Sequence, residues 1–306
     1  ARSVQEVTEE IVLKMAKHVK SITDQKYLCL AGGVALNCVA NGKLLRSGIF
    51  DDIFIQPAAG DAGGALGCAY IAWYQHLGNT RKADGKTDFM NGAYLGPEFS
   101  NDEIKNYLDR KGYDYKKLTD EELPEKIADL INEQNVIGWF QGRMEFGPRA
   151  LGGRTIIGDS RSSDTQRTIN LKIKYRESFR PFAPSIREEN ISEYFDIDRP
   201  SPYMLLVADV KKDKQLPMTD EQESYFGLKK LNIARSEVPA ITHVDYSARI
   251  QSVNRHTNKR YHDMLTVFNE KYGCPVIVNT SFNVRGEPIV CTPEDCLLYT
   301  SPSPRD

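Results

Sequence analysis

The sequence predicts an α/β protein, on two observations near its beginning and one further along. Short apolar strands at 27–33 and 52–57 each run through glycines into a helical segment, at 34–48 and 61–77 respectively. Two strand-to-helix units in succession are typical of α/β architecture. Apolar strands and helical segments then recur up to residue 280, so the rest of the chain fits the same class.

The first part of the chain begins with an amphipathic helix, because apolar residues recur at helical spacing from Val4 to Ile22. The helix predicted at 34–48 is closed by Gly48. The helix at 61–77 is built largely from small residues, so we expect it to pack tightly against a neighbour. Residues 78–92 are polar and without periodicity, which indicates a linker or surface loop.

The second part is expected to contain helices at 101–112 and 120–134 and a strand at 136–141 that leads into a segment rich in arginine and glycine. A helix follows at 163–171. Three more strands are predicted at 203–210, 240–245 and 275–280. A helix is predicted at 258–272, between the last two of these strands. The last residues, 296–306, break this rhythm, and we interpret them as a tail that is not native to the protein.

Composition indicates a soluble globular protein, with 40% hydrophobic and 27% charged residues in 306. This length allows two domains of ordinary size. No apolar run approaches the roughly 20 residues of a membrane span, and the beginning lacks the apolar centre of a signal peptide, so a cytoplasmic setting is expected. The six cysteines form no C-x-x-C pair; we interpret them as small core residues and expect no zinc site.

Positive charge is concentrated in residues 143–187, although the whole chain has a net charge of −2. This segment holds ten basic residues, eight of them arginine, against four acidic ones. Phenylalanines and prolines lie between the charges, which predicts partial burial, and buried like charges repel unless an anion joins them. Arginine suits bidentate binding of phosphate or carboxylate. We therefore expect a bound polyanion, with the glycines giving a mobile backbone that closes on phosphates, whereas Arg161 at the end of 142–161 can be an ordinary surface residue.

Three further motifs allow both a structural and a functional reading. The glycines at 31–37 and 57–69 each stand before a helix, where free N–H groups favour phosphate, but such turns are also common in α/β cores. Asp61 can cap its helix or ligate a metal. Residues 275–288 place four short polar side chains after a buried strand, as either a polar turn or a ligand-binding edge.

Taken together, these motifs resemble the O-carbamoyltransferase family of nodulation-factor and antibiotic tailoring enzymes. The resemblance is carried by "AGGVALN", "GDAGGALG", "GRMEFGPRALGGRTII", "IKYRESFRPFAPS", "SPYM" and "NTSFNVRGEPIV". It implies that residues 1–92 are the C-terminal portion of a TsaD-like carbamoyl-transfer domain with an actin/hexokinase-type fold. Residues 93–295 are implied to form a YrdC-like α/β domain that makes carbamoyl adenylate. The usual H-x-x-x-H metal pair is absent, so the chain is expected to be a fragment that lacks the N-terminal part of the first domain and retains partial activity.

The resemblance also implies a reaction in two steps. ATP and carbamoyl phosphate give carbamoyl adenylate in the YrdC-like domain, and the carbamoyl group then passes to a hydroxyl of a small molecule in the metal-bearing TsaD-like domain. Fe²⁺ and Mg²⁺ are the implied metals. The acceptor is a sugar, an antibiotic or a nodulation factor. A homodimer is compatible with this reading, whereas a membrane or nucleic acid is not expected as a partner.

The resemblance assigns roles to thirteen residues of this sequence. The catalytic group is Lys174, Arg149 and Arg180. The residues implied to bind ATP and carbamoyl phosphate are Arg154, Arg176, Arg249, Asn279, Ser281 and Asn283. In the TsaD-like domain, the implied nucleotide-binding residues are Gly32, Gly33 and Asn37, and the implied metal ligand is Asp61.

Other functions remain open at this stage. A basic YrdC-like fold could bind nucleic acid, with the steep salt dependence of phosphate contacts. Threonylcarbamoyl adenylate synthesis for tRNA modification would use bicarbonate and threonine instead of carbamoyl phosphate. Carbamoyl transfer in hydrogenase maturation normally requires zinc-finger cysteines and an acylphosphatase domain, and the sequence shows neither.

Overall fold

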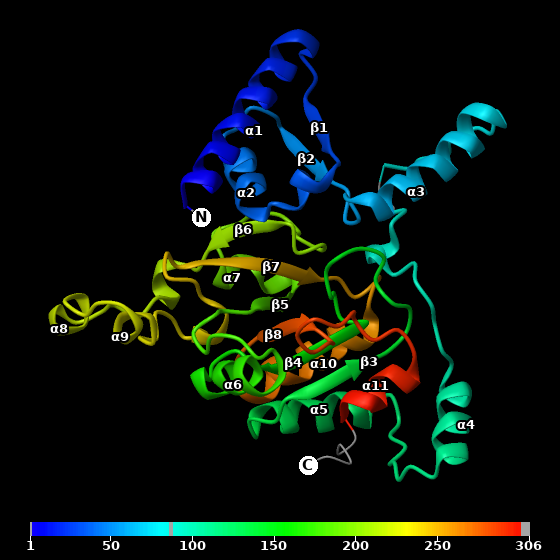
Figure 1. Cartoon of the computed structure of the whole chain (residues 1–306), viewed down its shortest axis with the longest axis vertical. Coiled ribbons are helices and arrows are strands. Elements are labelled where there is room, and N and C mark those ends of the chain that lie inside the picture. Colours follow the sequence, from blue (N-terminus) through cyan, green and yellow to red (C-terminus); the bar gives the residue numbers. More distant parts are fainter. Residues whose placement is uncertain (1, 86–87, 301–306) are drawn as a thin grey trace.

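The computed structural model describes residues 2–85 and 88–300 and divides them into two lobes (Figure 1). We call residues 2–77 the N-terminal lobe and residues 88–300 the sheet lobe. The first contains α1 (Arg2–Thr23), β1 (Tyr27–Leu30), α2 (Cys38–Arg46), β2 (Asp52–Ile55) and α3 (Asp61–Tyr70). None of the helices in the described part of the chain has the length and hydropathy needed to cross a membrane.

The N-terminal lobe confirms the two predicted strand-to-helix units. β1 and β2 pair in parallel, so their C-terminal ends meet, and the Gly32 amide donates to the Ala59 carbonyl at 2.8 Å. The helix expected at 34–48 is interrupted, because Asn37 ends the short 3-10 helix η1 (Gly33–Leu36) and its side chain then caps α2 by accepting from Ala40 N at 3.1 Å.

The tight packing that we expected for the helix at 61–77 is wrong for most of its length. None of the residues of α3 is buried, and its continuation η2 (Ile71–His76), a π-helix, carries exposed apolar side chains. Close approach is confined to the first turn, where a Cβ added to Gly63 would lie 2.1 Å from the Ala58 carbonyl oxygen.

The sheet lobe is built on a six-stranded mixed sheet. The order is β3 (Ile137–Phe140), β4 (Arg154–Asp159), β8 (Val276–Ser281), β5 (Ala183–Arg187), β7 (Ser247–Val253) and β6 (Leu206–Asp209). Only β5 and β7 are parallel neighbours, and every other pair of adjacent strands in this described sheet is antiparallel. The lobe is therefore a mixed α/β structure.

Three of the predicted strands are confirmed and one is wrong. The strand expected at 240–245 is replaced by η7 (Pro239–Ile241) and a turn, because Pro239 fixes its φ and begins a 3-10 helix. The strand in that region is β7, a few residues later. β4 and β5 were not predicted, since both are buried along almost their whole length and show no polar alternation.

Two helices fill one side of the sheet lobe. α5 (Glu122–Asn132) and α10 (Lys259–Tyr272) pack against each other and against strands of the sheet. Ile131, Leu265 and Phe268 are fully buried between them. Each fully buried large apolar side chain contributes about 1.5–3 kcal/mol, so this packing stabilises the sheet that carries the site.

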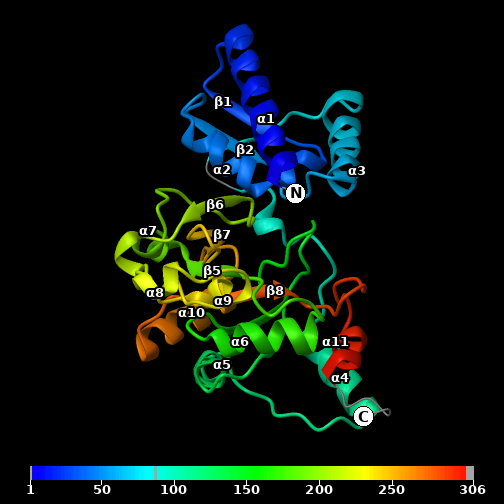
Figure 2. The same cartoon turned by 60° about the vertical axis from the view of Figure 1, so that its left-hand side comes forward.

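The two lobes meet along an edge of the sheet. Figures 1 and 2 both show α2 beside β6. Asn41 Nδ2 donates to the Leu205 carbonyl at 3.1 Å, and Arg46 Nη1 donates to the Val207 carbonyl at 2.8 Å. A Cβ on Gly42 would lie 2.6 Å from Val207 O, so glycine is needed for this close contact. α2 therefore covers the edge strand and fixes the lobes against each other.

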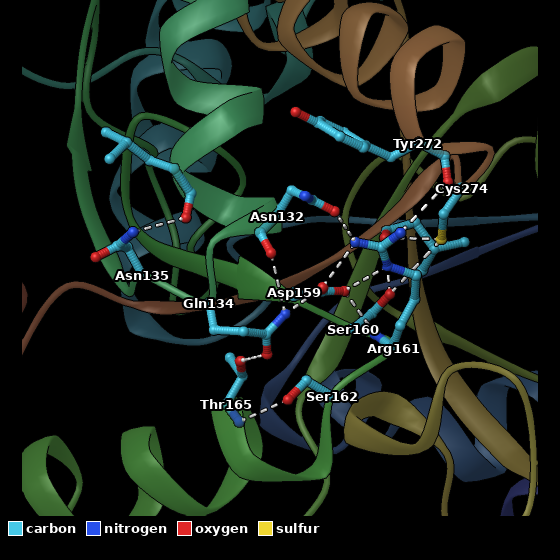
Figure 3. A network of polar contacts seen from close by, with 12 residues as sticks. Asn132, Gln134, Asn135, Asp159, Ser160, Arg161, Ser162, Thr165, Tyr272 and Cys274 are labelled. Carbon is cyan, nitrogen blue, oxygen red and sulfur yellow. Dashed lines mark hydrogen bonds and ion pairs between the residues drawn. The ribbon is translucent and has the colours of Figure 1, made fainter.

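A polar network at the end of β4 joins several elements (Figure 3). The buried Asp159 carboxylate accepts from Arg161 Nη2 at 2.8 Å and from Gln134 Nε2 at 2.7 Å, and Arg161 also donates to Asn132 Oδ1 at 2.9 Å. Thr165, in the first turn of the next helix, donates to Gln134 Oε1 at 3.0 Å. Arg161 is therefore not an ordinary surface residue, because it ties α5 to the end of β4.

The remaining helices are short or peripheral. The sheet lobe also contains the helices α4 (Asn101–Lys111), α6 (Ser163–Thr168), α7 (Ile191–Tyr194), α8 (Asp220–Glu223), α9 (Leu228–Leu231) and α11 (Pro293–Thr300). Its short 3-10 helices include η3 (Asn91–Ala93), η5 (Glu188–Asn190) and η6 (Lys212–Lys214). α6 continues as the π-helix η4 (Ile169–Ile173). The predicted tail begins inside α11, whereas residues 301–306 lie outside the described part of the chain, so its non-native origin stays a prediction.

Candidate functional site

The ammonium group of Lys174 lies in a pocket of neutral oxygen atoms at the end of β8. Its Nζ donates to Ser281 O at 2.5 Å, Asn283 Oδ1 at 2.8 Å, Asn283 O at 2.9 Å and Ser281 Oγ at 3.3 Å. The residue is 7% exposed. Burial, together with the nearby Arg176, lowers the pKa of Lys174 to about 7. Two motifs more than a hundred residues apart thus meet in one basic site.

The backbone before and after Lys174 is held in an uncommon form. The π-helix η4 ends when Lys174 N donates to Ile169 O at 2.9 Å, and Tyr175 then adopts a positive φ of 45°. A bulky residue in this region is strained and requires support from its surroundings. The turn separates the side chains of Lys174 and Arg176 while keeping both near the end of β8.

Asn170 supplies that support and was missed by sequence reasoning. Its side chain is fully buried, accepts from Arg176 Nε at 2.6 Å and donates to the carbonyls of Ser178 at 3.1 Å and Arg180 at 2.8 Å. The Arg176 guanidinium also lies 4.8 Å from the centre of the Phe182 ring. Asn170 therefore fixes the direction of Arg176, a role that a lone asparagine in a sequence does not reveal.

Two more arginines converge on this region from other elements. Arg149 Nη2 donates to the Leu36 carbonyl of the N-terminal lobe at 3.4 Å, while its buried Nε has no hydrogen-bond partner among the described residues. Arg249 comes from β7, beside Cys38 at the start of α2. Burial and the neighbouring guanidinium groups of Arg149 and Arg176 lower the pKa of Arg249 to about 10.

The described residues balance the charges of this cluster only weakly, through an attraction between Arg176 and Glu177. We call Arg149, Lys174, Arg176 and Arg249 the open basic cluster. In the part of the chain that the structure describes, none of the four forms an ion pair, although Arg143, Arg161, Arg180 and Arg187 do. Like charges held together without an ion-paired carboxylate among the described residues make the cluster a site for an anion, in which charge-assisted hydrogen bonds are strong.

The glycine-rich loop next to Arg149 is fixed, so the mobile backbone that we expected is wrong. The loop wraps around the buried Glu145 carboxylate, whose Oε1 accepts from Leu151 N at 2.6 Å and Gly153 N at 2.7 Å. Gly147 and Gly152 have positive φ, and added Cβ atoms would lie 2.9 Å from Pro57 O and 2.6 Å from the Tyr261 ring. The glycines serve close packing, and Glu145 is a second residue that sequence reasoning missed.

Two of the predicted site arginines lie outside the open basic cluster. Arg154 is fully buried, and its Nη1 donates to the carbonyls of Gln141 at 3.1 Å and Gly153 at 2.9 Å while the guanidinium lies 3.6 Å from the centre of the Phe140 ring. Because these groups already use its hydrogen bonds, Arg154 has a structural role. Arg180 is exposed and forms an ion pair with Glu177 at 2.8 Å.

Asn279 is a buried residue that supports the site. It is buried, and its Nδ2 donates to Ala150 O at 3.0 Å and Gln251 Oε1 at 2.7 Å, while Thr155 donates to its Oδ1. Gln251 donates in turn to Leu151 O at 2.6 Å. This network links β8 and β7 to the loop that carries Arg149. Asn279 therefore holds that loop in position instead of contacting a ligand.

The predicted site residues of the N-terminal lobe are mostly more exposed to solvent than those of the sheet lobe. Gly32 and Gly33 are exposed at the end of β1, and Asn37 exchanges hydrogen bonds with Gln5 as well as capping α2. Asp61 is exposed at the first residue of α3, and the described residues contain no group of three or more possible metal ligands. Cys29 and Cys68 are exposed, which corrects the expectation that the cysteines are core residues.

Comparison with family models decides the relationship of the chain. Residues 128–304 match the model described as "Carbamoyltransferase C-terminus", and residues 1–70 match "Carbamoyltransferase N-terminus". The chain belongs to the carbamoyltransferase family. Both matches lie in the order expected from the motifs, and together they include Lys174, Arg149, Arg176 and Arg249.

Several carbamoyltransferase relatives align with almost the whole chain. An uncharacterized protein of Synechocystis sp. is 60% identical over 98% of this chain and 49% of its own length. Nodulation protein NolO of Bradyrhizobium diazoefficiens is 40% identical over 96% of this chain and 50% of its own length. The 3'-hydroxymethylcephem-O-carbamoyltransferase of Amycolatopsis lactamdurans is 33% identical over 89% of this chain and 45% of its own length. The chain thus spans about half the length of the curated relatives that it matches.

Proposed function

We propose that this chain carries the adenylate-forming part of an O-carbamoyltransferase. The enzyme forms carbamoyl adenylate from ATP, carbamoyl phosphate and water, releasing phosphate and pyrophosphate, and then passes the carbamoyl group to a hydroxyl of a small molecule with release of AMP. The observation that carries the proposal is the open basic cluster, which is partly buried and forms no ion pair in the described chain. The name of the related 3'-hydroxymethylcephem-O-carbamoyltransferase supports carbamoyl transfer to a hydroxyl, and the name of the nodulation protein NolO fits a nodulation-factor acceptor.

In this proposal the cluster replaces solvent around the phosphates. The neutral oxygens that now accept from Lys174 are weaker partners than a phosphate oxygen, so an anion can compete for the ammonium group. Arg176 and Arg249 then oppose the negative charge that develops as the pyrophosphate leaves. An anion also raises the pKa of Lys174 from about 7, which keeps the amine charged when substrate is bound.

We further propose the finer fold assignment: a YrdC-like domain for residues 93–295 and a TsaD-like portion for residues 1–92. It is supported by the hydrogen bonds from Lys174 to the side chains of Ser281 and Asn283. The glycine turns that follow the paired strands β1 and β2 support it as well. The acceptor is a small hydroxyl compound of the sugar, antibiotic or nodulation-factor classes.

The described residues do not fit the implied Fe²⁺ site. Asp61 is exposed and belongs to no group of three possible ligands in the described part of the chain. Iron chemistry at this position requires further ligands. Mg²⁺ enters the proposal only as the usual companion of ATP phosphates.

A mass-spectrometric search for carbamoyl adenylate tests the proposal. The chain is incubated with ATP, Mg²⁺ and carbamoyl phosphate, and pyrophosphate release is measured in parallel, with bicarbonate plus threonine as the competing donor. We expect the adenylate from carbamoyl phosphate only, and a loss of about 100-fold or more in Lys174→Ala. The matched control is Lys172→Ala, two residues away and exposed. Equal product from wild type and Lys174→Ala would refute the proposal.

A further inference from the structure

A projecting arm of the sheet lobe takes no part in the site described above. The arm comprises residues 216–236 and contains the short helices α8 and α9. Figure 1 shows both helices standing away from the sheet, and the basic cluster lies on other elements. A role for the arm is therefore independent of the proposed reaction.

The arm is well structured although it projects. Its base is closed by Leu216 N, which donates to the Arg235 carbonyl at 2.8 Å. The buried Arg235 guanidinium donates to the carbonyls of Lys230 at 2.8 Å and Ile233 at 3.0 Å, which ties the end of α9 to the base. A capping box between Thr219 and Gln222 begins α8. These bonds hold the tip in a defined position.

The tip presents apolar side chains to solvent. Phe226 is 95% exposed, and the nearby Leu228 is 63% exposed. Gly227, with a φ of 63°, turns the chain between α8 and α9 directly after Phe226. An aromatic residue on an ordered element is a typical anchor of an interface.

The charges on the arm are divided between its two helices. α8 is acidic and α9 is basic, with Asp220, Glu221 and Glu223 on the first and Lys229 and Lys230 on the second. Lys230 Nζ donates to a backbone carbonyl at 2.7 Å and Lys229 lies 3.6 Å from the Tyr225 ring centre, so in the described chain neither lysine is neutralised by a carboxylate.

This pattern is complementary to itself. A two-fold rotation about an axis through the tip brings the acidic helix of one arm to the basic helix of another, with the apolar tip between them. A nucleic acid or an anionic membrane would meet the acidic helix directly beside Phe226, which disfavours both. We propose that the arm is the contact through which a second copy of this chain docks, α8 against α9, with Phe226 buried at the centre.

Sedimentation velocity at low ionic strength tests the arm with charge-reversed variants. One variant combines Lys229→Glu with Lys230→Glu, and the other combines Asp220→Lys with Glu223→Lys. We expect a dimer for the wild-type chain and monomers for Phe226→Ser and for each reversed variant alone. A mixture of the two reversed variants should form a mixed dimer, because an acidic arm then meets a basic one.

Three results would overturn the proposal: a monomeric wild type at the highest soluble concentration, reversed variants that dimerise as well as wild type, or a mixture that stays monomeric. The second result would place the contact on another surface, such as the exposed apolar side of α1. The substituted side chains lie on the arm rather than in the core, and circular dichroism with thermal melting checks that each variant is folded.

Discussion

The sheet lobe holds two groups of basic side chains that are opposite in physical role, although all of them except Arg249 lie within residues 149–176. Arg154 and Arg161 donate to backbone carbonyls and a buried carboxylate, so their charges are used within the fold. The groups of the open basic cluster donate only to neutral acceptors among the described residues, and they lie close to one another. The local excess of arginine therefore has two causes, one structural and one related to an anion, and substitutions can separate them.

The largest expected effect is on stability, from Arg154→Gln. The substitution leaves the carbonyls of Gln141, Gly142 and Gly153 without their shared donor and opens a gap beside the Phe140 ring. We expect a loss of about 3 kcal/mol in the free energy of unfolding, measured by urea denaturation. The activity per folded molecule should be retained. A variant as stable as wild type would remove Arg154 from the structural group.

Arg249→Gln is expected to act in the opposite way. Removing this guanidinium relieves repulsion with Arg149 and Arg176, so stability should stay equal or rise slightly. Under the proposed function, carbamoyl-adenylate formation should fall about 100-fold, since one group that stabilises developing charge is lost. Pyrophosphate release and urea denaturation on the same samples give both numbers. A loss of stability without a loss of rate would reverse the assignment of the two groups.

The sequence could not separate the structural arginines from the open basic cluster, because arginines of both groups stand among glycine, proline and aromatic residues. The motif resemblance picked out Lys174, Ser281 and Asn283, which the structure brings into contact. Glu145 and Asn170 were invisible, since their importance depends on backbone groups that converge only in the folded chain. A buried hydrogen-bond acceptor has no sequence pattern of its own.

The fold was predictable where periodicity is strong. The helices α1, α5 and α10 show regular apolar spacing, and all three are confirmed. β4 and β5 escaped prediction because a strand buried on both faces loses its polar alternation, and both contain or follow glycine, proline or arginine. The division into domains near residue 92 stays a prediction.

Asn170→Ala tests how the open basic cluster is positioned. The variant frees Arg176 Nε and the turn after it, so under the proposed function we expect a roughly 10-fold higher KM for carbamoyl phosphate with a smaller change in kcat. Asn170→Asp should restore much of the binding of Arg176, because a carboxylate accepts the same hydrogen bond. Asn190→Ala is a matched buried control on another element. Equal kinetic defects in Asn170→Ala and Asn190→Ala would show only a general loss of packing.

The smallest expected effect is a change in how stability depends on pH. The pKa of Lys174 is lowered from 10.5 to about 7 in the folded chain, so between these values the unfolded chain binds more protons than the folded one. Stability should therefore rise as the pH increases from about 7 toward 10.5, and below pH 7 the cost of burying the charged amine is fully present. Lys174→Met should be relatively more stable near pH 6 and should lose this part of the rise, which urea denaturation across the range would measure. An unchanged slope in the variant would mean that Lys174 keeps an ordinary pKa in its pocket, and that the neutral oxygens around it already compensate its charge as well as water does.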